Sequence, residues 1–247
     1  MPALVALSLA QGASADGCET ADATGVLFHG CRGTATARML LLPDSLPLPP
    51  LAPRAVLVSG GYTGTDTRDD GAPAPVGLTV LDGTAVGQTL ARMDGILILG
   101  PGDAAPRLVH RARAALDGRR YDLRDVDERR AFLAAARAGG VSVLQSHLLV
   151  VDGRVDTRPV DGAPVATRRV FFTKGAGFGV WESARPLTLD AAARALARDV
   201  APDMALNLDM GSYDVCLRGA AAGPEPCGFN QAGWQQRQTT LLLLQPR

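Results

Sequence analysis

The sequence lacks several features that would assign it to a class of protein at once. No apolar run approaches the length of a membrane-spanning helix, so an integral membrane helix is not expected. The 25 Lys and Arg residues are balanced by 25 Asp and Glu residues, so no net charge is available to attract nucleic acid. Lys174 is the single lysine, which we interpret as the codon bias of a high-GC genome.

Motifs typical of catalytic and cofactor sites are also missing. The chain contains no GxSxG, P-loop, HExxH or dinucleotide-binding fingerprint. Its cysteines have no CxxC spacing and its three histidines do not cluster with them, which argues against zinc. The segment GYTGTDTRDDG is rich in aspartate but lacks the EF-hand spacing. We therefore expect no cofactor, and the residues leave a divalent cation such as calcium open.

What the chain does contain is enough apolar sequence for a buried core. It has 247 residues, of which 47% are hydrophobic, a length that fits one domain, taken here as residues 16–247. Short apolar runs separated by Gly, Pro and Asp turns predict many strands, and regular alternation of strands and helices is absent. We expect an α+β fold with a mixed, largely antiparallel β-sheet core flanked by a few helices.

The clearest expected elements have recognisable ends. Residues 125–138 form a helix capped by Asp125, and Thr188 caps a second helix that ends before Pro202. Strands are expected at 54–62, 168–174, 177–182, 204–211 and 239–246. A hairpin is expected over 76–86 and another over 141–155, each around an Asp-Gly turn. Residues 43–53 and 62–75 are expected to be loops, and 104–123 fits either a strand or a helix.

The N-terminus suggests export from the cytoplasm. Residues 3–15 read ALVALSLAQGASA, an apolar stretch that ends in a small-residue pattern typical of signal-peptide cleavage. A basic segment before it is missing, and the alternative is a short strand or a frayed helix. We expect residues 1–15 to be a signal-peptide remnant and the protein to be periplasmic or secreted.

Four cysteines support the same interpretation. They form two pairs close in sequence, and the simplest pairing is Cys18–Cys31 with Cys216–Cys227, each closing a short loop. Four cysteines allow three connectivities, and four separate buried thiols are the alternative to disulfides. Disulfides fit an oxidising compartment.

Three expected strands end in polar or glycine-rich clusters. The clusters are SGGY from Ser59, QSH from Gln145, and NLDMGSYD from Asn207. Strand ends project side chains from a rigid platform, and glycines expose backbone N–H groups, so such ends suit a binding or catalytic site. Each cluster taken alone is equally consistent with an ordinary turn.

The order of these segments resembles the phosphodiester glycosidase domain family. VLVSGGYTG followed by APVGLTVLDG, VSVLQSHLLVVDGRV, TRRVFFTKGAGFGVW and the run from PLTLDAAARAL to ALNLDMG carry the likeness, over about residues 54–218. The chain departs from the family pattern at Ser59, where the family has Asn, at Tyr62 for Phe, at His147 for Gly and at Met210 for Gly. The resemblance implies hydrolysis of a sugar-1-phosphodiester at the glycosidic bond.

That reaction needs a carboxyl group, which we place first at Asp209. It follows an apolar strand, so partial burial would raise its pKa and suit a general acid, a general base or a water-positioning group. The alternative for Asp209 is an Asx-turn cap. Asn207 lies two residues away on the same strand face and is assigned with it to the catalytic group. Asp214 is a candidate second carboxylate or a solvated loop residue.

The remaining candidates would bind the substrate. Arg168 and Arg169 point to opposite faces of a strand, so one of them, taken as Arg168, would hold a phosphate and the other would be a surface charge. The other candidate substrate contacts, besides Asp214, are Ser59, Gly60, Gly61, Gln145, Ser146 and Gly211, through side chains or backbone N–H groups. For Gln145 and Ser146 the alternative is hydrogen bonding within the sheet.

The sequence thus predicts an exported hydrolase acting on a carbohydrate or glycolipid with a sugar-1-phosphate linkage. The departures at Ser59 and Met210 favour a second possibility, a catalytically inactive module on the same fold that binds a glycan or a phosphate. Neither prediction involves nucleic acid or a transmembrane segment.

Overall fold

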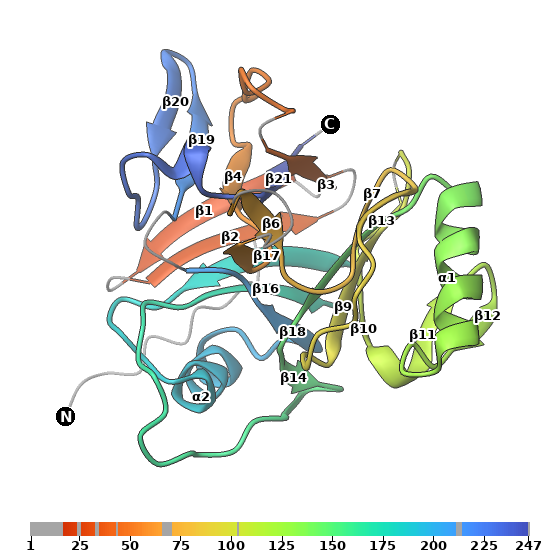
Figure 1. Cartoon of the computed structure of the whole chain (residues 1–247). Coiled ribbons are helices and arrows are strands. Elements are labelled where there is room, and N and C mark those ends of the chain that lie inside the picture. The colour runs from red at the N-terminus through yellow and green to blue at the C-terminus, as the bar shows by residue number, and fades with distance from the viewer. Residues whose placement is uncertain are drawn as a thin grey trace.

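The computed structural model places three large β-sheets around one shared interior (Figure 1), and two two-stranded ladders complete the described strands. It describes residues 17–23, 26–32, 35–42, 44–65, 71–102, 104–210 and 214–246, and for residues 17–29 and residue 32 it describes the backbone alone. The expected signal-peptide remnant, residues 1–15, lies outside the described residues. No helix in the described ranges is long and apolar enough to cross a membrane.

The largest sheet has seven strands in the order β1-β2-β17-β16-β18-β14-β15. Its members are β1 (Gly17–Ala23), β2 (Val26–Arg32), β14 (Leu148–Val151), β15 (Arg154–Val155), β16 (Arg169–Lys174), β17 (Gly177–Glu182) and β18 (Met204–Asn207). The strands predicted near 168–174 and 177–182 are confirmed as the β16–β17 hairpin. Helix α2 (Leu189–Asp199) covers one face, and its Ala193 and Leu196 pack with Trp181. Its predicted cap is confirmed, because the Thr188 hydroxyl accepts from the Ala191 N–H.

A second sheet, called here the β13 sheet, has the order β10-β9-β13-β7-β8. Its strands are β7 (Thr79–Leu81), β8 (Thr84–Gly87), β9 (Gly95–Leu99), β10 (Arg107–His110) and β13 (Ser142–Ser146). Helix α1 (Val126–Ala138) stands against it, with Phe132 and Ala136 facing Val143. Asp125 caps α1 as predicted, accepting from the N–H groups of Asp127 and Glu128. The ambiguous segment 104–123 forms β10, the short helix η1 (Arg111–Arg113) and the ladder of β11 (Ala114–Leu116) with β12 (Arg119–Tyr121).

The third sheet, called here the β21 sheet, has the order β20-β19-β4-β21-β3. Its strands are β3 (Thr36–Leu41), β4 (Val56–Ser59), β19 (Cys216–Ala220), β20 (Gly223–Pro226) and β21 (Thr240–Gln245). The predicted strand at 239–246 is thus confirmed as β21, and it lies between β4 and β3. A second short helix, η2 (Trp234–Gln236), precedes β21.

Two segments differ from the sequence predictions. Residues 62–75, expected to be a loop, contain β5 (Thr63–Thr65) paired with β6 (Pro73–Pro75). The hairpin expected over 141–155 is only its second half, β14 with β15 around the Asp152–Gly153 turn. Its first half, β13, belongs to the β13 sheet, so the chain passes from one sheet to another at His147. The apolar alternation continues through this crossing, so the sequence pattern does not reveal it.

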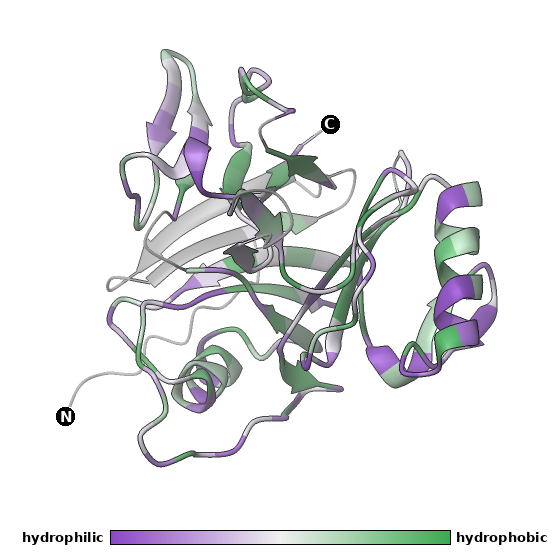
Figure 2. Ribbon diagram, in the orientation of Figure 1, coloured by the Kyte–Doolittle hydropathy of each residue, from purple (hydrophilic) through white to green (hydrophobic). Residues whose placement is uncertain are grey.

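The three sheets bury one common apolar cluster. Its members come from every sheet, for example Leu144 in β13, Phe171 in β16 and Leu242 in β21. Each such side chain, when fully buried, stabilises the fold by roughly 1.5–3 kcal/mol. Figure 2 shows the same division, with hydrophobic strands at the centre and hydrophilic residues on α1 and the β19–β20 hairpin. The strand pairs of the described chain are antiparallel, which confirms the expectation of a largely antiparallel core with few helices.

Candidate functional site

The three polar strand ends singled out from the sequence meet in space. The Asp209 N–H donates to the Gly60 carbonyl oxygen at 2.9 Å, which joins the end of β18 to the end of β4. The Asn207 N–H donates to the His147 carbonyl oxygen, also at 2.9 Å, which joins β18 to the end of β13. Segments that are distant along the chain therefore build one neighbourhood around the end of β18.

Tyr62 lies at the centre of this neighbourhood. Its hydroxyl oxygen accepts a hydrogen bond from Asn207 Nδ2 at 2.6 Å. Its ring meets the His147 ring edge-on, with centroids 5.9 Å apart and planes at 80°. Burial is the main reason that the pKa of Tyr62 rises to about 12, with Asp209 adding to the rise while Arg168 and the Asn207 hydrogen bond oppose it. Tyr62, His147, Arg168, Asn207 and Asp209 are called the Tyr62 cluster below.

Asp209 brings a carboxyl group that is only partly exposed. One carboxylate oxygen, Oδ2, accepts from the Thr63 N–H at 3.2 Å. Burial raises the pKa of Asp209, and backbone hydrogen bonds from Thr63 and Met210 oppose that rise. The predicted direction of this shift is therefore the one found, and the carboxyl group suits proton transfer nearer to neutral pH than a solvated aspartate does.

Arg168 brings a buried positive charge to the same place. Its side chain is 8% exposed, and its guanidinium donates to two neutral acceptors, the carbonyl oxygens of Leu187 at 2.9 Å and Pro164 at 2.7 Å. Within the described residues no carboxylate forms an ion pair with it. Burial lowers the pKa of Arg168, and Tyr62 opposes this. A buried guanidinium without a carboxylate partner is a natural place for an anion.

Asn207 carries an unused hydrogen-bonding atom beside these groups. The residue is 1% exposed, and its Oδ1 has no partner among the described residues. The Ser146 hydroxyl donates to the Asn207 carbonyl oxygen at 2.5 Å, so Ser146 holds the Asn207 backbone. A buried acceptor of this kind is satisfied when a ligand hydroxyl or a water donates to it.

Gly60 and Gly61 pack closely, and their N–H groups are occupied. The Gly60 N–H donates to the Thr240 carbonyl oxygen and the Gly61 N–H to the Thr240 hydroxyl, each at 2.9 Å. A Cβ at Gly61 would lie 2.6 Å from Leu144 Cδ1, and one at Gly60 2.7 Å from Thr240 Oγ1. These glycines allow the end of β4 to pack closely against Thr240 of β21 and Leu144 of β13. The sequence had instead suggested an anion-binding nest.

Gln145 has no free hydrogen-bonding atom in the structure. Its Oε1 accepts from the N–H groups of Leu78 and Ala91 at 2.9 and 3.0 Å. Its Nε2 donates to the carbonyl oxygens of Ala91 and Met93 at 3.0 and 2.6 Å. The side chain is fully buried and ties the 77–93 segment to β13, which is the alternative weighed from the sequence.

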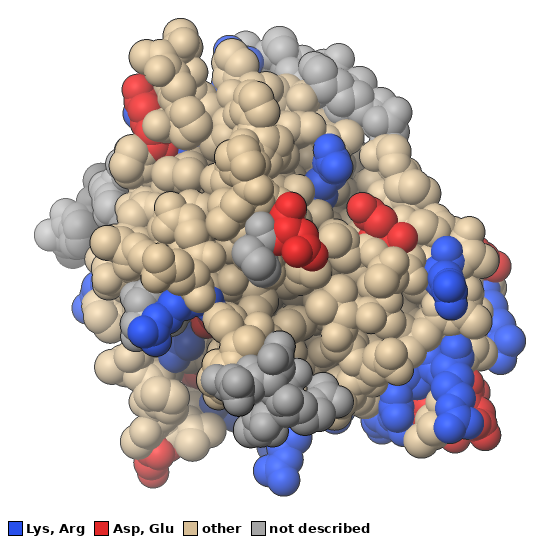
Figure 3. Space-filling view, turned by 45° about the horizontal axis from the view of Figure 1, so that its top comes forward, with Lys and Arg blue, Asp and Glu red and all other residues tan. Residues whose placement is uncertain are grey.

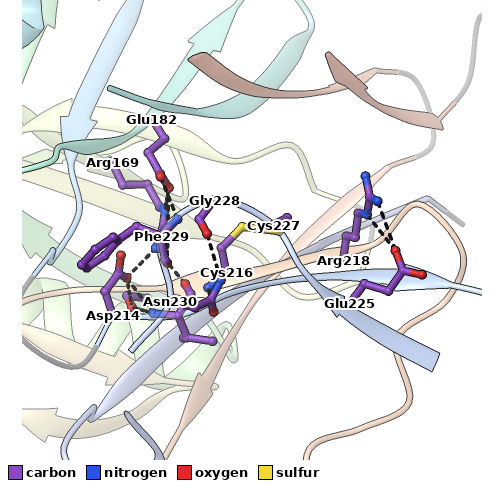
Figure 4. Close-up of a disulfide and its surroundings, with 12 residues drawn as sticks. Arg169, Glu182, Asp214, Cys216, Arg218, Glu225, Cys227, Gly228, Phe229 and Asn230 are labelled. Atoms are coloured by element: carbon purple, nitrogen blue, oxygen red, sulfur yellow. Dashed lines mark hydrogen bonds and ion pairs between the residues drawn. A yellow bond between two sulfur atoms is a disulfide. The ribbon is translucent and has the colours of Figure 1, made fainter. Parts of the chain in front are cut away.

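Ser59 and Asp214 belong to a buried charge network, and Figure 4 shows its members Arg169, Glu182 and Asp214. Asp214 Oδ1 accepts from the Ser59 hydroxyl and from Arg169 Nη1, each at 2.5 Å. Arg169 also pairs with Glu182, with Nη2 and Oε2 2.5 Å apart. Asp214 is therefore not a solvated loop residue, and the expectation that the second arginine is a surface charge is wrong, because Arg169 is 0% exposed. Burial raises the pKa of Asp214 to about 6, against the opposing effect of Arg169.

The predicted disulfide between Cys216 and Cys227 is present and tethers the segment that borders this network. Phe229 in that segment donates its N–H to Glu182 Oε1 at 2.9 Å and accepts from Arg169 Nη2 through its carbonyl oxygen. Cys31 is also disulfide-bonded. The register of β1 with β2 sets Cys18 opposite Cys31, while the Cys18 side chain lies outside the described residues.

Two sequence predictions concern residues that the structure does not describe. Gly211 lies outside the described residues, as does the aspartate-rich segment 66–70 for which calcium was left open. Across the described ranges, no group of three His, Cys, Asp or Glu side chains is arranged to hold a metal ion. A surface cavity of about 440 Å³, lined by Arg38, Asp82 and Ser142 among others, shares no residue with the Tyr62 cluster.

Two members of the Tyr62 cluster were missed from the sequence as functional residues. From the sequence, Tyr62 and His147 were noted only as departures from the family pattern, in place of Phe and Gly. The available signal was their position, directly after the ends of β4 and β13. Burial lowers the pKa of His147, as does Arg168, while Asp94 opposes the shift, so the ring is favoured in its neutral form.

Charge on the surface follows no single sign. Figure 3 shows basic and acidic side chains scattered over the visible face, with arginines gathered among acidic residues at one edge. The visible face therefore carries both signs of charge, in agreement with the balanced composition.

The fold of this chain is similar to that of solved structures of other proteins. One of these structures is the catalytic domain of zebrafish N-acetylglucosamine-1-phosphodiester alpha-N-acetylglucosaminidase, auto-inhibited by its pro-peptide. It matches with a TM-score of 0.52 and 13% identity, over 93% of this chain and 82% of that one. A hypothetical protein from Synechocystis matches with a TM-score of 0.52 and 11% identity, over 93% of this chain and 61% of that one.

At these identities the likeness shows the fold alone. No protein-family model matches the chain, and no curated protein is found as a relative. The resemblance to the phosphodiester glycosidase family therefore stands as a distant relationship of fold, and the chemistry has to be argued from this chain's own residues.

Proposed function

We propose that the protein hydrolyses a sugar-1-phosphodiester at its glycosidic bond, in a glycan or glycolipid outside the cytoplasm. The observation that carries the proposal is that a buried arginine without a carboxylate partner and a partly buried aspartate with a raised pKa both lie near Tyr62. An anion-binding cation beside a carboxyl group is what this reaction requires.

The reaction follows from the roles these residues suit. Arg168 binds the phosphodiester anion, and Asn207 Oδ1 accepts from a sugar hydroxyl. Asp209 accepts a proton from water as the water oxygen bonds to C1 of the sugar. The bond from C1 to the phosphate oxygen breaks, and its electron pair leaves with the phosphate. The products are a free sugar and a phosphomonoester.

One carboxyl group is sufficient for this reaction. Glycosidases that expel an alcohol use a second carboxylic acid to protonate the leaving oxygen. A phosphomonoester leaves as a stabilised anion, so that acid is not required. This fits the structure, because Asp214, the candidate second carboxylate, is 0% exposed and bonded within the Arg169 network.

Export is supported by disulfide bonding and remains part of the proposal. The structure contains the Cys216–Cys227 disulfide, and disulfides persist in oxidising compartments. The expected leader, residues 1–15, lies outside the described residues.

The test is release of free sugar from methyl phosphodiesters of N-acetylglucosamine 1-phosphate and glucose 1-phosphate. Wild type is expected to release sugar, and Asp209→Asn to be slower by at least about 100-fold, since it loses the proton acceptor. The matched control is Asp161→Asn, which changes an exposed carboxylate outside the cluster. Equal rates for wild type and Asp209→Asn would remove Asp209 from the mechanism.

A second candidate is a non-catalytic module that binds a glycan or a phosphate on the same fold. The departures from the family pattern at Ser59 and Met210 favour it. In the same experiment this function gives no sugar release by wild type, together with binding of glucose 1-phosphate that Arg168→Gln abolishes.

A further inference from the structure

The side chain of Asn207 determines how the Tyr62 hydroxyl can use its proton. The Nδ2 group of Asn207 has hydrogens to donate and no lone pair to accept with. In its 2.6 Å contact with Tyr62 the phenol oxygen is therefore the acceptor. The phenol proton is left to be donated elsewhere, and no described residue accepts it.

Asn207 itself is held firmly, so this arrangement is built into the fold. Its N–H donates to the His147 carbonyl oxygen, its carbonyl oxygen accepts from the Ser146 hydroxyl, and its Nδ2 also donates to the Leu208 carbonyl oxygen. The His147 ring packs edge-on against the Tyr62 ring at 5.9 Å. The phenol is thus positioned from two sides before any ligand arrives.

The charges around Tyr62 show what such a donor would meet. Arg168 and Asp209 both lie close enough to shift the pKa of Tyr62 in opposite directions. The phenol therefore lies near both the cation proposed to hold the phosphate and the carboxyl group proposed to activate water. A ligand that binds to both groups comes close to Tyr62.

We infer that Tyr62 is a further catalytic residue, which donates a hydrogen bond to the phosphate oxygen that leaves C1. This inference rests on the proposed function and extends it. When the bond from C1 to that oxygen breaks, the phosphate gains a second negative charge, so the hydrogen bond strengthens as the bond breaks. Tyr62 keeps its proton throughout, and the proton removed from water goes to Asp209.

The test compares Tyr62→Phe with Tyr121→Phe. The first variant removes only the hydroxyl and keeps the ring against His147. The second removes the hydroxyl of a tyrosine that packs against Phe132 on the α1 side, outside the cluster. Both are expected to keep the melting temperature of wild type within a few degrees.

Tyr62→Phe is expected to lower kcat by about 10- to 100-fold and to change KM by less than about threefold, because the lost hydrogen bond is strongest in the transition state. Its pH–rate profile between pH 5 and 9 is expected to keep the wild-type shape, since a phenol with a pKa of about 12 does not titrate there. Tyr121→Phe is expected to match wild type in both respects. An unchanged kcat in Tyr62→Phe, or a pH limb lost with the hydroxyl, would overturn the inference and leave the proposed function standing.

If wild type hydrolyses neither phosphodiester, the proposed function fails and the inference is decided by binding of glucose 1-phosphate. Binding that weakens about tenfold in Tyr62→Phe and not in Tyr121→Phe would retain Tyr62 as an anion donor. Equal affinities in the two variants, or no binding by wild type, would overturn it.

Discussion

The buried carboxyl group of Asp214 makes the stability of this protein depend on pH in an unusual direction. Its Oδ1 accepts from Ser59, from Arg169 and from the Val215 N–H, while its Oδ2 is buried without a partner in the described part of the chain. Arg169 is shared with Glu182, so one cation faces two carboxylates. Burial accordingly raises the pKa of Asp214 from 3.8 to about 6.

The sign follows from where the proton is held more tightly. The folded protein binds this proton more strongly than the unfolded chain, so Asp214 adds stability at low pH. That contribution is complete below pH 3.8 and is lost as the pH rises through about 6. One pKa unit corresponds to about 1.4 kcal/mol, so the loss between pH 4 and pH 7.5 amounts to about 2–3 kcal/mol.

Urea unfolding of wild type and Asp214→Asn at several pH values measures this term. Other groups also titrate, so the informative quantity is the difference in unfolding free energy between the two proteins. The amide cannot ionise, and we expect the variant to gain about 2–3 kcal/mol relative to wild type between pH 4 and pH 7.5. Asp161→Asn serves as the exposed control and is expected to show a difference that does not vary with pH.

The reasoning would be refuted by a difference between wild type and Asp214→Asn that stays constant over this range. A difference that moves the other way, with the variant losing ground as the pH rises, would show that Arg169 outweighs burial and holds Asp214 ionised. General damage would lower the stability of the variant equally at every pH, so the test rests on how the difference between the two proteins changes with pH.

Two further predictions concern residues that tie the framework together. Gln145→Ala is expected to lower the unfolding free energy by about 3 kcal/mol or more, because it leaves the buried N–H groups of Leu78 and Ala91 without their shared acceptor. A loss below about 1 kcal/mol in urea unfolding would contradict the role of Gln145 in tying the 77–93 segment to β13. Replacing Cys216 and Cys227 together by Ala is expected to cost roughly 3 kcal/mol, since the disulfide closes a short loop of separation 11. Thermal unfolding of that variant beside oxidised wild type would check the second value, and no change in melting temperature would contradict it.

Local chemistry made parts of the fold predictable. Both helices begin where a capping side chain precedes an amphipathic run, at Asp125 and Thr188. The Asp-Gly turns at 82–83 and 152–153 connect paired strands as expected. Those features depend on a few neighbouring residues, so the sequence alone specifies them.

The crossing at His147 and the roles of the two arginines were not predictable in the same way. Alternation along β16 correctly sends Arg168 and Arg169 to opposite faces, but it does not tell whether both faces are covered. Here both are, so Arg169 lies in the interior rather than in solvent. Which sheet a strand joins depends on partners far along the chain.

The candidate site was likewise predicted only in part from the sequence. The sequence located the strand ends that meet, which is why Asn207 and Asp209 were found. It did not show which side chains face one another. The polar amide of Gln145 suggested a substrate contact, but in the structure that amide forms its hydrogen bonds with backbone groups. The sequence did not show that Tyr62 and His147 meet, because their contact spans 85 positions of sequence.

The link between β13 and β14 has a consequence for how this chain can change in length. His147 is the single residue between Ser146 and Leu148, the ends of strands in two different sheets. Adding or deleting one residue there would turn every side chain of β14 to the opposite face. Leu149 and Val150 would exchange their surroundings, and the contact of His147 with Tyr62 would be lost. Insertions during evolution are therefore expected to accumulate in exposed connections such as 156–165, while the segment from 142 to 151 keeps its length.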